Sequence, residues 1–204
     1  MAKNSVRELL ISTATGLFSR KRYLDSSIRE IGEAAQVNPS LFYHYFKNKE
    51  EILYIIVERG GLYIFNSLQE IQKKERDPVE CLKKMISQCF FMGLKKEVVI
   101  SLREISLLNR RQMTEITSLG LKTRNLFLDQ LKKLKRLNML KQGNLTVMTF
   151  SILGLLTWFY EWYIEATLID RGEQLKNEEI VNQVIEIIFS GILNSNRTTE
   201  GVQV

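Results

Sequence analysis

The sequence is poor in the residues that build reactive and metal-binding sites. Its 204 residues include one histidine, His44, and two cysteines, Cys81 and Cys89. With this one histidine we find no serine or cysteine triad that the sequence could assemble conventionally, and two cysteines with one histidine fall short of a zinc-ligand pattern. No glycine-rich phosphate loop is present either. We therefore expect a protein that is not an enzyme and that carries no cofactor and no metal.

The two cysteines also indicate the cellular compartment in which the protein acts. Cys81 and Cys89 are eight residues apart in what is expected to be one helix, too far apart for a disulfide between them. Free cysteines are typical of the reducing cytosol, so we expect a cytoplasmic protein. The first residues, MAKNSVRELLIST, lack a long apolar core after their charges, and we expect no signal peptide.

Helix-breaking residues are scarce as well. Two prolines and eleven glycines leave few interruptions, which favours long helices over many short strands. Apolar residues make up 45% and charged residues 25% of the chain, a composition that argues against disorder. The formal net charge of +6 suits an anionic partner, although such a charge is also common among unrelated proteins. The sequence predicts an all-α protein.

One apolar stretch, residues 145–169, is long enough to cross a membrane. It contains Glu161 and Glu165, and each carboxylate would cost roughly 2.5–3.5 kcal/mol in the middle of a bilayer. We therefore expect no membrane contact. A helix that is apolar all round is otherwise buried on all sides, so we interpret this segment as a helix buried within an oligomer.

Three helices are predicted for the first fifty residues. The first covers residues 6–21, where apolar residues recur at the i, i+4, i+7 and i+8 spacing of one buried stripe. The second begins after Ser27, which is expected to form a capping box with Glu30. The third begins at Asn38, with Pro39 in the first helical position. A short turn joins the second helix to the third, which is the layout of a helix-turn-helix.

The third helix carries an aromatic cluster between Phe42 and Phe46. These two residues are four apart and are expected to face inward, each filling the small core of the three helices. Tyr43 lies at the edge, where its hydroxyl can reach a phosphate. The side chains expected on the opposite face, free to enter a groove, are Ser40, Leu41, His44 and Tyr45. A surface histidine without a role is the alternative interpretation of His44.

A fourth helix is predicted from Asn48, its cap, to about Lys73, with Glu51 as the reciprocal capping acid. Lys49 stands in its first turn, where a lysine meets the positive end of the helix dipole. A phosphate in the same place would be held by Lys49, by the free N–H groups and by the dipole together. A solvated surface lysine is the alternative, but beside Tyr43 and a helix-turn-helix we favour the phosphate contact.

The segment SSIREIGEAAQVNPSLFYHYFKNKEEIL, residues 26–53, resembles the DNA-binding segment of TetR-family transcriptional regulators. The family pattern ends its third helix in Tyr-x-x-Phe-x-x-Lys, which is present here as Tyr43, Phe46 and Lys49. Gln36 departs from the pattern, because the family usually has glycine in this turn. We expect Gln36 to accept a left-handed or near-helical backbone at a cost of roughly 1 kcal/mol.

Two further departures do not remove any position expected to face DNA. Asn38 stands where the family often has serine, and Arg22 precedes Tyr23 where glycine is common. The fold that the resemblance implies is an N-terminal helix-turn-helix domain, residues 1–50, followed by a helical ligand-binding and dimerisation domain, residues 51–204.

The resemblance implies roles by position. Ser27, Tyr43 and Lys49 would hold phosphates of double-stranded DNA. Arg29 would reach base edges, where an arginine suits guanine. The rest of the base readout would come from Ser40, Leu41, His44 and Tyr45, and Lys3 and Arg7 would add backbone contacts. The function implied is that of a repressor that binds a near-palindromic operator as a homodimer and is released by a small-molecule effector.

Further helices are predicted from Pro78, over residues 97–109 and 112–136, over 145–169, and over 178–194 with Asn177 as cap. Gly60 and Gly61 lie within the fourth helix, where each costs about 1 kcal/mol relative to alanine. Close packing against another helix or a bend between the two domains would each explain them.

Aromatic and methionine side chains of the middle helices form a candidate ligand pocket, although such stripes are more often core. Its residues are Phe90, Ile105, Leu108, Met113, Phe127, Trp158 and Trp162. The stretch WFYEWYIEA also resembles the TetR branch that senses acyl-CoA thioesters, but that branch follows Trp-Tyr closely with glycine, and here Gly172 comes later. We expect an apolar or acyl-CoA-type effector. A DNA-architecture protein with no effector is the alternative.

The last two long helices are expected to form the dimer. In the family they pack against their symmetry mates as a four-helix bundle, which the apolar excess of this chain permits. The residues to which we assign this role are Phe150, Leu153, Ile164, Ile180, Val184, Ile188 and Gly191. A purely intramolecular core is the alternative interpretation of the same stripes.

Overall fold

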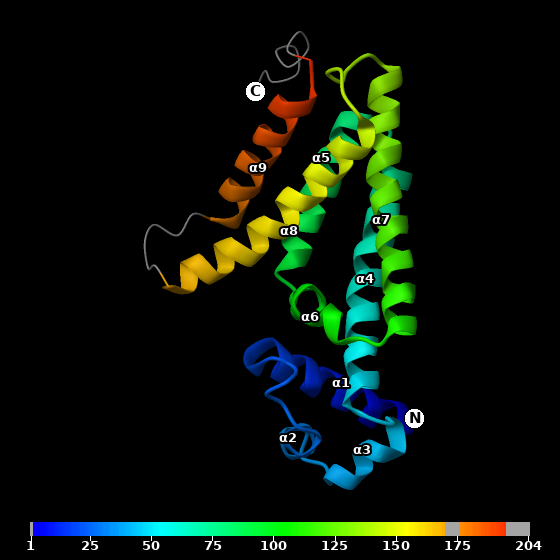
Figure 1. Cartoon of the computed structure of the whole chain (residues 1–204), viewed down its shortest axis with the longest axis vertical. Coiled ribbons are helices and arrows are strands. Elements are labelled where there is room, and N and C mark those ends of the chain that lie inside the picture. Colours follow the sequence, from blue (N-terminus) through cyan, green and yellow to red (C-terminus); the bar gives the residue numbers. More distant parts are fainter. Residues whose placement is uncertain (1, 170–175, 195–204) are drawn as a thin grey trace. The chain divides into compact units, whose positions relative to one another are not determined.

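The computed structural model describes the backbone of residues 2–169 and 176–194 and the side chains of residues 5–159 and 176–194. Within these ranges the chain is all-helical, as predicted (Figure 1). The elements are α1 (Ala2–Lys21), α2 (Ile28–Ala34), α3 (Pro39–Tyr45), α4 (Lys49–Lys74), α5 (Pro78–Gly93), α6 (Lys96–Glu104), the 3-10 helix η1 (Ile105–Leu107), α7 (Arg110–Arg136), α8 (Leu145–Ile169) and α9 (Asn177–Ile192).

Some helix ends differ from the predictions. The helix predicted over residues 97–109 ends as an α-helix at Glu104 and continues as the 3-10 turn η1. The last helix begins one residue early, so that Asn177 is its first residue and Lys176 occupies the cap position. At the start of α4, Asn48 accepts the Glu51 N–H at 2.8 Å as predicted, but the Glu51 carboxylate accepts the N–H of Lys47 rather than that of Asn48.

The chain divides into two compact units, each built from segments far apart in sequence. The first unit contains Met1–Ile64 and Gly93–Gly120, and the second contains Phe65–Met92 and Leu121–Val204. The first unit therefore combines α1, α2, α3 and the first part of α4 with α6 and the start of α7. It extends beyond residues 1–50, to which the sequence assigned the DNA-binding domain, and that boundary stays a prediction.

One hydrophobic cluster fills the first unit. The predicted stripe of α1 is buried in it, together with Ile31 of α2 and Phe42 and Phe46 of α3. Ile100 of α6 and Leu108, just before α7, belong to the same cluster. Full burial of side chains of this size contributes about 1.5–3 kcal/mol each. The helix-turn-helix therefore shares its core with helices from the middle of the chain.

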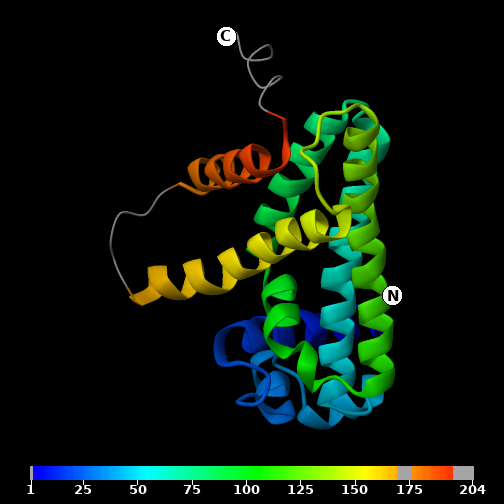
Figure 2. The same ribbon diagram turned by 45° about the horizontal axis from the view of Figure 1, so that its top comes forward.

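Gly60 and Gly61 serve close packing, one of the two explanations that the sequence left open. Helix α4 runs through both glycines without interruption. A Cβ atom on Gly60 would lie 3.1 Å from the carbonyl oxygen of Glu97, and one on Gly61 would lie 2.8 Å from Cδ2 of Leu119. A side chain at Gly60 would press on the backbone of α6, whereas one at Gly61 would displace only the end of the Leu119 side chain on α7. Helix α7 runs beside α4 in both views (Figure 2).

In the second unit, side-chain contacts connect α4 to α7 and α5 to α8, and a backbone bridge holds the end of α9. The Gln72 amide of α4 donates to the Leu126 carbonyl of α7 at 2.7 Å, and the rings of Phe90 in α5 and Phe159 in α8 are 5.8 Å apart. The end of α9 is fixed by a β-bridge between Leu140 and Leu193.

Both cysteines lie in α5 and are free thiols. Among the described residues, no helix combines the length and hydropathy needed to cross a membrane.

Candidate DNA-binding surface

Helix α2 begins with the capping box that the sequence predicted. The Ser27 hydroxyl accepts the N–H of Glu30 at 3.1 Å, and the Glu30 carboxylate accepts the N–H of Ser27 at 2.9 Å. The ammonium of Lys21, at the end of α1, lies 2.7 Å from the same carboxylate. The hydrogen bond from Lys21, followed by the bonds from Ser27, lowers the pKa of Glu30 to about 2. This carboxylate therefore stays charged and ties α1 to the start of α2.

The turn between α2 and α3 has the backbone expected from Gln36. Its φ is 56°, in the left-handed region, and this prediction is confirmed. The turn is also tight, because a Cβ on Gly32 would lie 2.9 Å from the Cα of Pro39. The N–H of Val37 donates to the Gly32 carbonyl at 3.0 Å. Glycine at position 32 thus allows α2 and α3 to approach as a helix-turn-helix requires.

Helix α3 is anchored on one side and exposed on the other. Phe42 and Phe46 are buried, as predicted, with ring centroids 5.2 Å apart. Asn38 caps the helix by accepting the Ser40 N–H at 2.9 Å, and it also accepts the Ser40 hydroxyl at 2.8 Å. The Ser40 hydroxyl proton is therefore committed to the cap, which leaves its oxygen as an acceptor.

The residues assigned to DNA differ in exposure. Ser40 and His44 are exposed, and the Tyr43 side chain is 63% exposed beside α3's buried face. Leu41 is half-buried, and Tyr45 is half-buried because it packs against the hydrophobic cluster. The exposed face of α3 is thus formed mainly by Ser40, Tyr43 and His44.

Arg29, on α2, is exposed and already paired. Its guanidinium Nε lies 2.7 Å from the carboxylate of Glu33, one turn along the same helix. This hydrogen bond raises the pKa of the Arg29 guanidinium. Surface pairs of this kind are weak and exchange readily, so the pairing does not prevent Arg29 from reaching a base edge.

Lys49 makes contacts that the sequence did not suggest. Its ammonium donates to the carbonyl oxygens of Tyr23, at 2.7 Å, and Ser26, at 2.5 Å. It also lies 4.1 Å from the centroid of the Tyr23 ring, within the range of a cation–π contact. Burial lowers the pKa of Lys49. An ammonium has three N–H donors, so two of them hold the loop between α1 and α2.

Glu104, at the end of α6, binds the same loop and was missed by the sequence reasoning. Its side chain is buried, and its carboxylate lies 3.5 Å from the N–H of Tyr23 and 3.4 Å from Nε of Arg22. Arg22 has a φ of 73°, which explains why glycine is common at this position in the family. No signal in the sequence distinguished Glu104, because Glu97 and Ser101 lie on the same face of α6.

Two further contacts join α4 to α7 within the first unit. The Tyr54 hydroxyl lies 2.9 Å from the carboxylate of Glu58 and 2.7 Å from that of Glu115, and its pKa is raised by burial and by these carboxylates. The side-chain amide of Asn109 donates to Glu50 at 2.7 Å. These bonds fix the first turns of α4, which carry Lys49.

The residues of the candidate ligand pocket fall in both units. Ile105, Leu108 and Met113 belong to the first unit, and Ile105 and Leu108 pack in its hydrophobic cluster. The remaining described residues of the set belong to the second unit, where Phe90 and Phe127 are buried and Trp158 is 61% exposed. Trp162 lies outside the residues whose side chains are described.

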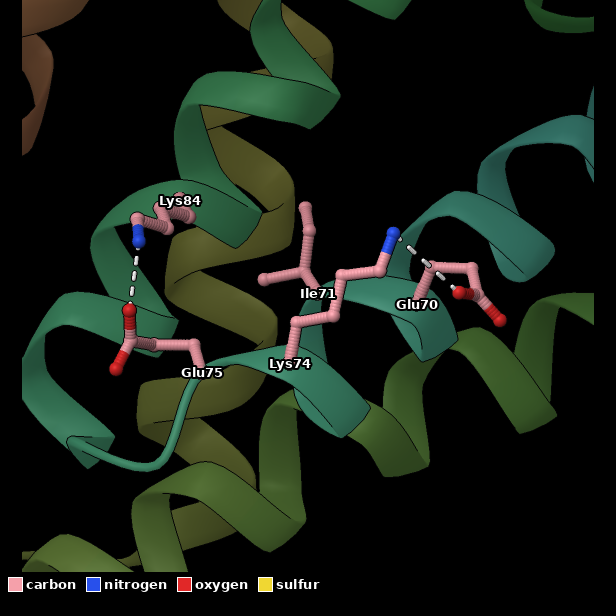
Figure 3. Close-up of a pocket in the computed structure, with 5 residues that line it drawn as sticks. All are labelled: Glu70, Ile71, Lys74, Glu75 and Lys84. Carbon is pink, nitrogen blue, oxygen red and sulfur yellow. Dashed lines mark hydrogen bonds and ion pairs between the residues drawn. The ribbon is translucent and has the colours of Figure 1, made fainter.

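A hollow of about 230 Å³ lies where α4 ends and α5 begins, away from the candidate pocket residues in sequence. It is lined by Glu70, Ile71, Lys74, Glu75 and Lys84 (Figure 3). Its charged side chains pair with one another: the Lys84 ammonium lies 2.6 Å from the Glu75 carboxylate.

Among the described residues, no group of histidine, cysteine, aspartate and glutamate side chains is arranged to hold a metal ion.

The residues assigned to the dimer interface are placed differently on α8 and α9. Phe150 is 53% exposed and Leu153 is half-buried on α8, and Gly191 is exposed on α9. In contrast, Ile180, Val184 and Ile188 are buried inside the protomer itself, so this stripe of α9 faces the chain's own core. Ile164 lies outside the residues whose side chains are described.

The geometry of α2, the turn and α3 defines a helix-turn-helix protein. Residues 10–54 match the family model described as bacterial regulatory proteins, tetR family. Residues 75–192, more than half of the chain, match the model described as tetracyclin repressor-like, C-terminal domain. The chain belongs to the TetR family of transcriptional regulators and is not an enzyme.

Curated relatives agree with this assignment. The chain is 32% identical over 108 residues to the uncharacterized HTH-type transcriptional regulator YerO of Bacillus subtilis (strain 168), an alignment that covers 50% of this chain and 36% of YerO. It is 38% identical over 52 residues to the HTH-type transcriptional regulator HbdR of Aromatoleum sp. (strain CIB), covering 26% of this chain and 23% of HbdR. The chain thus matches about a third or less of the length of these relatives.

Solved structures share the fold over nearly the whole chain. AibR in complex with isovaleryl coenzyme A and operator DNA superposes with a TM-score of 0.79 at 24% identity, over 90% of this chain and 98% of AibR. The ketosteroid transcriptional regulator KstR2 of Mycobacterium tuberculosis gives a TM-score of 0.79 at 19% identity, over 92% of this chain and 95% of KstR2. At these identities the likeness concerns the fold.

Proposed function

We propose that this TetR-family regulator is a ligand-responsive repressor that binds a near-palindromic operator as a homodimer. The observation that carries the proposal is the two-sided arrangement of α3. Phe42 and Phe46 lock the helix into the core, while Ser40, Tyr43 and His44 are exposed on it. A rigid helix with one polar, exposed face is suited to the major groove of DNA, which admits one α-helix.

The contacts with DNA divide into two kinds. Ser27, Tyr43 and Lys49 contact phosphates, which set the register of the protein without reading the sequence. Lys49 does so while two of its N–H donors hold the loop that precedes Ser27. Base edges are read by Arg29 of α2 and, on α3, by the exposed Ser40 and His44 together with the half-buried Leu41 and Tyr45.

Dimerisation is carried by apolar side chains that remain exposed on the second unit. On α8 these are Val147, Phe150 and Trp158, and on α9 Ile187 is 59% exposed, next to the exposed Gly191. Exposed apolar patches of this kind are typical of interaction surfaces. The buried face of α9, with Ile180, Val184 and Ile188, forms part of the protomer's own core beneath this exposed surface.

The effector is an apolar or acyl-CoA-type molecule bound by the second unit, and the protein acts in the cytoplasm. The support is the acyl-CoA complex of AibR, a neighbour of the same fold, together with the buried aromatic residues of the second unit.

The test is DNA release by a defined ligand. Operator DNA selected from a random pool is bound to the protein, and isovaleryl-CoA is then titrated against the complex. A typical coupling of about 1–3 kcal/mol predicts a 5- to 150-fold loss of DNA affinity. Tight DNA binding that neither isovaleryl-CoA nor longer acyl-CoA thioesters change would instead support a DNA-architecture protein without an effector.

A further inference from the structure

Gln130 is a buried amide in the middle of α7. Its side chain is 1% exposed, and it lies on the same face as Phe127 and Leu134, which are fully buried. Neither the amide nitrogen nor the amide oxygen of Gln130 has a hydrogen-bond partner among the described residues. A position that would normally hold leucine or methionine thus carries two buried polar atoms without partners.

The other fully buried polar side chains of the described structure are satisfied, and the remaining buried polar atom without a partner is Nε of the half-buried Arg124. Thr15, Ser26 and Thr149 each donate to the carbonyl oxygen four residues earlier, at 2.8, 2.8 and 2.7 Å. The Glu104 carboxylate accepts from Tyr23 and Arg22. Since buried polar groups in folded proteins nearly always have partners, Gln130 is an exception that requires an explanation.

A second glutamine, on the neighbouring helix α4, shows that a side-chain amide in this part of the protein can find a hydrogen-bond partner within the chain. Gln72, on α4, donates its Nε2 to the carbonyl oxygen of Leu126, one turn before Gln130 on α7. Gln130 has no equivalent bond. A buried amide without a partner destabilises a fold more than an apolar side chain of the same size would. Its presence is explained if the partner is a molecule that is not part of the chain.

We propose that Gln130 binds the effector, and that the group it binds is uncharged and polar, as an amide is. The Gln130 carboxamide offers both an N–H donor and a carbonyl acceptor, so it can pair with the carbonyl or with the N–H of such a group. This inference rests on the proposed function, in which the second unit holds the effector, and it names the chemistry of one contact within that site.

The charge of the surroundings selects the neutral class. Gln130 and Thr149 are the buried polar side chains of the second unit that the structure describes, and both are neutral. The Thr149 hydroxyl already donates to Leu145. Nε of Arg124 is also buried, but it lies six residues before Gln130 and therefore on another face of α7. A charged ligand group at Gln130 would thus meet no described countercharge on its own face, which is strongly unfavourable. An acyl-CoA thioester is compatible with this site if Gln130 binds an uncharged amide group of the coenzyme A and the coenzyme A phosphates lie outside the buried region.

The experiment compares Gln130→Met with Gln72→Met in the full-length protein at equal concentration. The first change removes an amide without a partner, and the second removes an amide with one. The probes are isovaleryl-CoA and isovaleramide, a small neutral amide. Without a probe, we expect Gln130→Met to raise Tm by about 2–4 °C and Gln72→Met to lower it. With a probe, we expect Gln130→Met to weaken binding about tenfold and Gln72→Met to leave it within twofold.

Each other outcome is decisive. If Gln130→Met lowers Tm and binds both probes like the parent, the amide is structural and the proposal is wrong. If the parent binds isovaleryl-CoA and Gln130→Met binds it equally well, the effector class stands and the role of Gln130 falls. If neither probe binds the parent, the neutral-amide contact is rejected, and so is isovaleryl-CoA as the effector. DNA binding, measured separately on selected operator, tells whether the repressor function itself survives.

Discussion

The ammonium of Lys49 lies 2.7 Å from the carbonyl oxygen of Tyr23, at the junction of α1 and α2, although the two residues are 26 positions apart in the chain. The buried carboxylate of Glu104 accepts the N–H of the same residue, so Tyr23 is held from both sides. The loop that leads into the capped start of α2 is thus fixed by one residue from α4 and one from α6. The stability of this loop and the proposed phosphate contact therefore depend on the same lysine.

Lys49→Met should lower both stability and DNA affinity. The change leaves the carbonyl oxygens of Tyr23 and Ser26 without their donor, which costs about 1–2 kcal/mol in the free energy of unfolding. It should weaken binding to all DNA sequences alike, because phosphates carry no sequence information. Urea unfolding and binding to selected and scrambled DNA measure the two effects. Lys47→Met, at an exposed neighbouring position, is the matched control. A change in base preference with stability intact would contradict this assignment.

Gln36→Gly should stabilise the protein by about 1 kcal/mol, because it removes the strain of a side chain at a φ of 56°. The control is Ala35→Gly, one residue earlier, where φ is −80° and the methyl group is buried. That change should destabilise, since it adds backbone freedom and removes buried surface. Thermal unfolding of the two variants should therefore shift in opposite directions, and equal shifts would show that the turn is not strained at Gln36.

Arg29→Ala and Tyr43→Phe should separate base reading from phosphate binding. Arg29→Ala should reduce discrimination at one base pair by about 10- to 100-fold if the arginine reads a guanine. Tyr43→Phe removes only a hydroxyl and should weaken binding uniformly. Competition between selected operator and single-base variants measures both. Loss of discrimination in Tyr43→Phe but not in Arg29→Ala would reverse the two roles.

Glu30 should make the free energy of unfolding depend on pH in the acid range. Its pKa is lowered in the folded protein from 4.5 to about 2. A lowered pKa means that the unfolded chain takes up the proton more readily, so the contribution is fully present above the unfolded value and is lost as pH falls from about 5 to about 2. Glu30→Gln should therefore destabilise at pH 6 and have a smaller effect at pH 3. Thermal unfolding at the two pH values measures this, and an effect that does not shrink in acid would show that the carboxylate charge is not involved.

The local part of this account could be predicted from sequence, and the long-range part could not. The capping box of Ser27 and Glu30, the Asn38–Pro39 helix start and the strained Gln36 all depend on residues within a few positions. The bond from Tyr23 to Glu104 joins residues 81 positions apart, and no periodicity indicates it.

Periodicity also identifies a buried face without identifying what covers it. The α9 stripe of Ile180, Val184 and Ile188 was assigned to a partner subunit, but it is buried by the protomer's own chain. Gln130 illustrates the same limit, because a glutamine among apolar residues reads as a surface position until its burial is known.

The most direct test of the central claim is selection of DNA from a random pool by the purified protein, followed by sequencing and by measurement of the mass of the complex. If α3 of each subunit reads a major groove, the enriched sites should be near-palindromic, with half-site centres about 34–36 Å apart or a multiple of that distance, and the complex should contain an even number of chains. Enrichment of a single half-site bound tightly by one chain, or no enrichment at all, would contradict the account.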